Sequence, residues 1–279
     1  MAGGLVALPV CAGLSLITAG GGALALEWRR QVAVERTRHI LRGTRQLPVY
    51  PGFLSGAVYA IENFATWWWC GWMLAFAPLI ALSGYFQLRV LEDEGLVEEA
   101  AKFRGSLLVA PSLAGVAGLL MGLGSVANKA GPWVGFAVHW PLASCFQGCT
   151  FVYCAANIPL ATTLYGMGGL FIVRVLLVSL GGLGLLGMML LLGPAMKATQ
   201  TLWEVDAVAT SDKYMHEEEA GSNSTGKSIP TLPENRDEVE AMILTLRRMV
   251  FRASFCQMCI GFSLGLAICS GAAESLAEA

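Results

Sequence analysis

The chain has 279 residues, of which 55% are hydrophobic and 14% are charged, and its formal net charge is −2. Soluble domains usually carry about 25% charged residues, so this composition excludes an ordinary soluble domain. The apolar residues form runs long enough to cross a bilayer, without the alternation that barrel strands would show. We therefore predict an all-α fold, a polytopic transmembrane helix bundle of about six spans.

The apolar runs and the polar segments between them give the expected order of elements. A strongly basic segment, 27–50, follows the first span; its spacing is helical until Gly43, after which Pro48 and Pro51 break the pattern. Residues 53–64 are expected to lie along the membrane interface. The six expected spans are residues 5–26, 66–88, 106–127, 136–160, 168–195 and 249–271.

These spans divide the chain into three parts. Residues 1–195 form a five-span membrane bundle, residues 196–246 a hydrophilic and largely disordered loop, and residues 247–279 the sixth span with a short tail. Within the loop part, a charged helix is expected to begin at Arg236. Five spans is the alternative if residues 136–195 pair differently.

Aromatic and small residues mark two of the spans. Trp67, Trp68 and Trp69 open the second span, where amphipathic rings favour the headgroup level; contact with a sterol or quinone is the alternative. In the third span, Gly118 and Gly122 have the spacing that allows close helix approach. Residues 91–105, between these spans, are expected to form a short acidic loop.

Basic residues concentrate on one side of the expected membrane. The first, third and fifth loops hold fourteen Lys and Arg residues against three in the second. The positive-inside rule then places both termini outside and segment 196–246 inside. Asn223 begins a glycosylation acceptor sequence, which requires the opposite orientation, and we follow the charge asymmetry.

The segment from Gly221 to Ser228, GSNSTGKS, matches the phosphate-binding loop pattern. That loop requires a preceding strand and a following helix. Here an acidic run precedes the pattern and two prolines follow it, so no nucleotide is expected to bind. The chain likewise shows no basic patch interleaved with aromatic residues, and nucleic-acid binding is not expected.

Few polar residues inside the spans suggest chemistry. Arg174 is a charge within the fifth span, where a structural or snorkelling role competes with headgroup binding or transport. Glu62, Asn157 and His139 are its candidate partners. The eight cysteines lie in apolar segments and are expected to be small buried hydrophobes. No catalytic constellation, metal site or cofactor site is expected.

Spans two to five share a loose pattern of residues: Tyr85 and Arg89 at the end of span two, a glycine-rich span three ending near Ser125 and Asn128, then His139, Ala143, Tyr153 and Arg174. In this pattern the chain resembles the Frag/DRAM/Sfk family of six-span membrane proteins over roughly residues 70–180. The resemblance implies an endomembrane or lysosomal protein linked to autophagy or lipid-anchor handling, without established catalysis.

The residues favour a non-enzymatic membrane protein that is a scaffold or an accessory subunit of a membrane complex. A subunit of the mitochondrial inner membrane is one concrete version. Its expected partners are the lipid bilayer and other membrane subunits, contacted through Arg174, His139, Glu62 and the Trp67–Trp69 run. The alternative is a transporter or lipid-handling protein in which Arg174 and His139 line a polar cavity.

Overall fold

The structure is a computed structural model that describes residues 2–42, 45–52, 64–127, 132–165, 167, 169–210 and 236–277. All regular secondary structure in these residues is helical, which confirms the all-α bundle. The phosphate-loop pattern, Asn223, Glu62 and the expected interfacial segment up to residue 63 lie outside the described residues.

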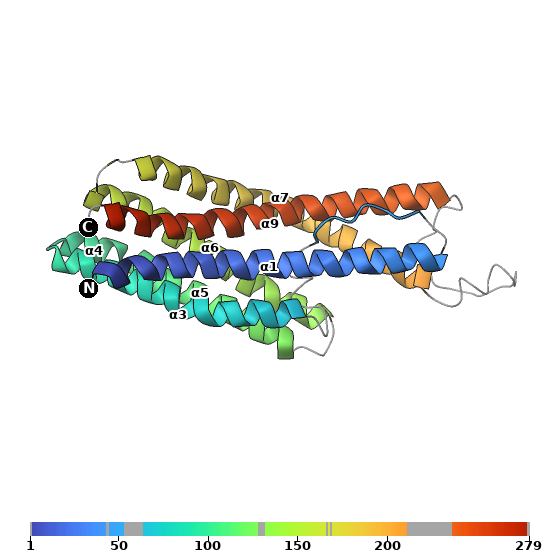
Figure 1. Cartoon of the computed structure of the whole chain (residues 1–279), viewed down its shortest axis with the longest axis horizontal. Coiled ribbons are helices and arrows are strands. Elements are labelled where there is room, and N and C mark those ends of the chain that lie inside the picture. Colours follow the sequence, from blue (N-terminus) through green and yellow to red (C-terminus); the bar gives the residue numbers. More distant parts are fainter. Residues whose placement is uncertain are drawn as a thin grey trace, which may run out of the picture.

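The helices run back and forth along one long axis, with the N- and C-terminal ends at the same end of the bundle (Figure 1). α4, a π-helical turn (η1) and α5 follow one another without a break, so six long helical rods pass through the bundle. The elements are α1 (Ala2–Arg42), α3 (Phe64–Asp93), α4 (Val97–Arg104), η1 (Gly105–Val109), α5 (Ala110–Ala127), α6 (Pro132–Tyr165), α7 (Gly169–Thr210) and α9 (Arg236–Ala277).

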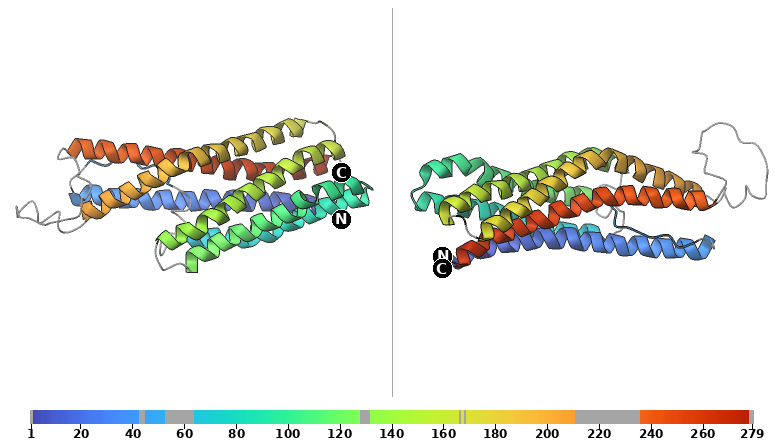
Figure 2. Two further views of the ribbon diagram at one scale, coloured as in Figure 1. Left: turned by 180° about the vertical axis from the view of Figure 1, so that it is seen from behind. Right: turned by 90° about the horizontal axis from the view of Figure 1, so that it is seen from above.

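Among the residues that the structure describes, five segments are long and apolar enough to cross a membrane, which makes the chain a multi-pass integral membrane protein. The expected fourth span, now α6, is not among them because it carries Gln147 and Asn157 between its apolar residues. α6 nevertheless runs along the bundle in the two views of Figure 2. The five segments are Ala7–Ile40, Trp67–Asp93, Val97–Leu123, Leu170–Leu202 and Asp237–Ser270.

The acidic connection after α3 is shorter than the expected loop of residues 91–105. α3 continues to Asp93 and α4 begins at Val97. Gly95 has a φ of 77°, a left-handed conformation that glycine adopts without strain. The N–H of Leu96 donates to the carbonyl of Leu91 (2.9 Å) and that of Gly95 to Glu92 (3.1 Å), a Schellman ending that reverses the chain in three residues.

The hydrophilic segment between the last two long helices also contains more helix than expected. α7 continues through residues 196–210 and ends at Thr210. α9 begins at Arg236, the residue where the sequence places a charged helix. Likewise, α1 ends at Arg42, directly before the glycine at which the helical spacing stops.

Three helices extend beyond the others at the end opposite the termini, as both views of Figure 2 show. α1, with 41 residues, is about 60 Å long at 1.5 Å per residue, roughly twice the hydrocarbon thickness of a bilayer. We call residues 27–42 of α1, 197–210 of α7 and 236–250 of α9 the helical projection.

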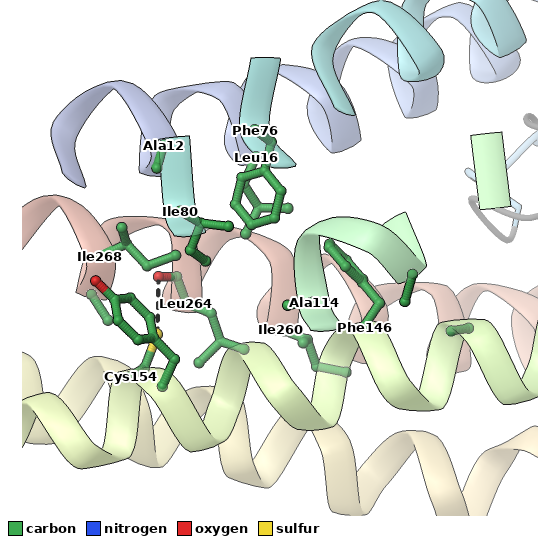
Figure 3. Close-up of a cluster of buried hydrophobic side chains, with 14 of the residues drawn as sticks. Ala12, Leu16, Phe76, Ile80, Ala114, Phe146, Cys154, Ile260, Leu264 and Ile268 are labelled. Atoms are coloured by element: carbon green, nitrogen blue, oxygen red, sulfur yellow. Dashed lines mark hydrogen bonds between the residues drawn. The ribbon is translucent and has the colours of Figure 1, made fainter. Parts of the chain in front are cut away.

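The interior of the bundle is filled by apolar side chains from α1, α3, α5, α6 and α9 (Figure 3). Phe76 of α3 is fully buried and meets Phe146 of α6 edge to face, with ring centroids 5.9 Å apart. The thiol of Cys154 donates to the carbonyl of Leu264 over 3.7 Å, which connects α6 to α9.

Glycines let the helices approach closely. A Cβ on Gly118 would lie 2.9 Å from Met73 Sδ, and one on Gly122 would lie 2.8 Å from Cys70 Sγ, so this pair packs α5 against α3 as its spacing predicts. At Gly84 of α3 an added Cβ would collide with the carbonyl oxygen of Leu107, within the π-helical turn.

Candidate functional site

Arg174 is buried in the bundle, with 1% of its surface exposed. Its Nη2 donates to the carbonyl oxygen of Ser270 (3.1 Å), its Nε to Ser270 Oγ (3.3 Å), and its Nη1 to the carbonyl oxygen of Asn157 (3.4 Å). The guanidinium therefore joins α7 to α6 and α9 instead of extending to the membrane surface. Of the three partners expected for Arg174, Asn157 is in contact with it, through the backbone carbonyl oxygen.

A chain of polar side chains continues from this point toward α3. The Asn157 Oδ1 accepts a hydrogen bond from Gln87 Nε2 (2.9 Å), and the Tyr153 hydroxyl donates to Gln87 Oε1 (3.0 Å). Asn157 Nδ2 in turn donates to the Tyr153 carbonyl (2.8 Å). Arg174 is thus part of a polar network that ties four helices together, and buried polar groups need such partners in a membrane.

His139 lies far from this network. It is buried and precedes Asn157 on α6 by 18 residues, about 27 Å along the helix axis. Its ring meets that of Trp140 edge to face, with centroids 5.5 Å apart. The transporter hypothesis expects His139 and Arg174 to line one cavity. The structure does not bring these two residues together.

The three consecutive tryptophans have three different environments, because successive side chains on a helix point about 100° apart. Trp67 is 65% exposed. Trp68 donates from Nε1 to the Thr18 carbonyl of α1 (2.9 Å). Trp69 is buried against Phe146, with centroids 6.1 Å apart, so it is not part of the expected belt at the headgroup level.

A partly open cavity of about 60 Å³ lies between α1, α3, α5, α6 and α9. Its wall is mostly apolar, and His139, Gln147 and Gln257 add polar groups. Trp69 also lines it, and its indole Nε1 is buried with no hydrogen-bond partner in the described part of the chain. No local sequence pattern indicates this cavity, because its lining residues come from five separate helices.

The helical projection is joined by a buried ion pair. Arg247 of α9 donates from Nη2 to Glu35 Oε2 of α1 (2.5 Å), with 16% and 7% of the two side chains exposed. The other Glu35 oxygen accepts the N–H of Leu47 (3.2 Å), and Arg247 Nη1 donates to the Pro48 carbonyl (3.1 Å). Sequence reasoning missed this pair, because its members are 212 residues apart.

Residues 45–52, which we call the strap, therefore lie across α1 and α9. Besides the Leu47 and Pro48 bonds, Trp28 of α1 donates from Nε1 to the Val49 carbonyl (3.3 Å). The ring of Tyr50 lies 5.3 Å from that of Phe251 on α9, centroid to centroid. The strap and the ion pair together hold α1 and α9 in one arrangement within the helical projection.

The outer surface of the projection is basic along α1 and the strap. Arg29 and Arg36 on α1, Arg45 on the strap and Arg248 on α9 are exposed, and the acidic Asp237 and Glu238 are exposed in the first turn of α9. Glu27 is different: it is buried and accepts hydrogen bonds from Arg30 (2.7 Å) and Gln31 (3.0 Å). The acidic groups of α1 are thus enclosed, while several arginines face outward.

The cysteines are free, and their burial differs from the expectation. Cys70 and Cys154 are buried, five others are partly exposed, and Cys11 is exposed. Cys256 and Cys259 have no third ligand nearby: among the described residues, no group of three or more His, Cys, Asp or Glu side chains is arranged to hold a metal ion.

Comparison with protein-family models, with curated proteins and with solved structures found no match to this chain. Of the residues that carry the family resemblance, Asn128 lies outside the described residues. Arg89 donates from Nε to the Tyr85 hydroxyl (3.1 Å) on the exposed end of α3, while Tyr153 and Arg174 belong to the buried network.

Proposed function

We propose that this protein is a non-enzymatic scaffold or accessory subunit of a membrane complex, which binds a partner protein through the helical projection. The observation that carries the proposal is the buried Glu35–Arg247 pair, which lies outside the spans 5–26 and 249–271 expected from the sequence and is reinforced by the strap. A fixed arrangement of helices beyond the bilayer offers a preorganised surface, which lowers the entropic cost of binding.

The charge on that surface indicates the kind of partner. Arg29, Arg36, Arg45 and Arg248 are exposed, so an acidic protein surface complements the projection. Arginine is favoured at interfaces because its planar guanidinium binds carboxylates with two hydrogen bonds. By the positive-inside rule the projection faces the cytoplasm, or the matrix if the protein resides in the mitochondrial inner membrane.

The geometry supports two other functions less well. A transporter that uses Arg174 and His139 together would need them in one cavity, and about 27 Å of α6 separates His139 from Asn157, the neighbour of Arg174. A role of the Frag/DRAM/Sfk type rests on the sequence resemblance alone.

Purification in mild detergent from the cells that produce the protein tests the proposal. We expect a particle larger than the 29.6 kDa chain, containing a second protein in fixed ratio. Reversing the exposed charges by Arg29→Glu and Arg36→Glu should release that protein without unfolding the bundle. A monodisperse monomer with no co-purifying protein would contradict the proposal.

A further inference from the structure

The cavity beside Trp69 lies within the apolar part of the bundle, apart from both the projection and the Arg174 network. Leu16 and Gly20 of α1 line it from one side, and Gly261 of α9 lines it from another. These residues belong to segments apolar enough to cross a membrane. A molecule reaching the cavity would therefore come from the lipid.

Two glycines in its wall are not explained by helix packing. A Cβ built on Gly20 or on Gly261 would meet no other atom within 4 Å. Elsewhere glycines permit close contacts, as at Gly118, where an added Cβ would lie 2.9 Å from Met73. Gly20 and Gly261 instead leave open space in the cavity that larger side chains would fill.

The polar groups of the wall include an unused donor. The indole N–H of Trp69 has no hydrogen-bond partner within the described residues, although Trp69 is 97% buried (3% exposed). An unsatisfied buried donor is costly, and indole can only donate. A ligand oxygen that reaches this N–H and accepts its hydrogen bond would remove the penalty, and the amide of Gln147 adds a donor and an acceptor to the wall.

We propose that this cavity binds the head of a neutral lipid whose polar group is a hydrogen-bond-accepting oxygen, such as a sterol hydroxyl or a quinone carbonyl. A volume of about 60 Å³ exceeds the 10–15 Å³ that one water needs, but it is smaller than a whole lipid. The apolar body of the ligand then lies between the helices and the bilayer. The lining contains no Lys or Arg that would compensate a phosphate.

The proposal is tested with the full-length chain in nanodiscs, using two photoreactive probes: a diazirine cholesterol and a diazirine quinone. After irradiation, mass spectrometry locates the labelled peptides. We expect labelling of the cavity-lining parts of α1 and α9, displaced by excess unlabelled lipid of the same kind. The probe that labels identifies the source of the oxygen, sterol or quinone.

Three variants make the test specific. Gly20→Leu and Gly261→Leu add bulk to the cavity wall from α1 and from α9, at positions where an added Cβ meets no atom within 4 Å, so each should lower labelling about tenfold. Gly71→Leu is the control, because Gly71 also has no atom within 4 Å of an added Cβ but lies away from the cavity. Trp69→Phe keeps a ring and removes the N–H, and should lower labelling about two- to tenfold.

Each possible result either supports the proposed site or contradicts it. Competable labelling that falls in Gly20→Leu or Gly261→Leu and persists in Gly71→Leu supports the site. Absence of labelling by both probes, labelling confined to other surfaces, or equal labelling in the filled variants overturns it. The location of the label in the unmodified chain decides the matter even if a filled variant fails to fold.

Discussion

Glu35 and Arg247, 212 residues apart in the chain, form a largely buried ion pair of 2.5 Å between α1 and α9, outside the apolar core. Each member also binds the strap, Glu35 through the N–H of Leu47 and Arg247 through the carbonyl of Pro48. One pair thus connects three separate parts of the chain, and the proposed docking surface depends on it.

Breaking this pair should loosen the projection and leave the bundle folded. Arg247→Leu leaves the Glu35 carboxylate buried without its cation, which we expect to cost about 3 kcal/mol. Hydrogen–deuterium exchange at residues 45–52 should rise strongly, because the strap loses its bond to Arg247, while exchange in α5 stays unchanged.

The charge-swapped double variant, Glu35→Arg with Arg247→Glu, is the control for the pair itself. It should recover part of the lost protection, since opposite charges again face each other. Recovery is incomplete because a glutamate cannot donate to the Pro48 carbonyl. Equal protection in the wild type and in Arg247→Leu would show that the pair does not hold the strap.

Arg174 is expected to act in folding. Arg174→Leu removes donors to Ser270 and Asn157, and hydrogen bonds to charged groups contribute about 1.5–3 kcal/mol each. Thermal unfolding in detergent should show a clear loss of stability and lower yield. Ser270→Ala removes only the hydroxyl contact and should cost less, about 1 kcal/mol. Full stability of Arg174→Leu would contradict a structural role.

Close packing of α3 against the π-helical turn predicts a sharp glycine effect. Gly84→Ala places a methyl group against the Leu107 carbonyl, and such overpacking costs about 1–3 kcal/mol. Gly71→Ala on the same helix meets nothing within 4 Å and should be neutral or stabilising by up to about 1 kcal/mol. Similar melting temperatures for the two variants would refute the close contact.

The orientation of the protein predicts that Asn223 carries no glycan. The positive-inside rule places the expected loops with fourteen Lys and Arg residues inside and both termini outside, and the termini lie at the end of the bundle opposite the projection (Figure 1). Treatment with a glycosidase should not change the mass of the chain. An acceptor sequence appended to the N-terminus should be glycosylated; modification of Asn223 instead would reverse the orientation.

Local sequence patterns predicted those parts of the fold that depend on residues close together in the chain. Composition and run length indicated the helical bundle, the end of α1 followed from Gly43 and the prolines, and the Gly118–Gly122 spacing indicated a close helix contact. The hydropathy pattern did not predict that α7 continues through residues 196–210. A helix supported by neighbouring helices can continue outside the bilayer, where the sequence is polar.

The candidate site depended on contacts between distant segments, which one sequence does not reveal. Arg174 was correctly singled out, but its contacts with Ser270 and Asn157 follow from how α6, α7 and α9 cross. His139 and Trp69 line one cavity although 70 residues separate them. Neither that cavity nor the Glu35–Arg247 pair has a local pattern in the sequence.

The most direct test of the scaffold proposal is site-specific photo-cross-linking in native membranes. A photoreactive amino acid replaces Arg36 on the projection, or Leu183 on the outward face of α7, where 66% of the side chain is exposed. The account predicts a discrete protein adduct from position 36, lost with Arg247→Leu, and lipid adducts alone from position 183. A folded chain that gives no protein adduct at position 36 would contradict it.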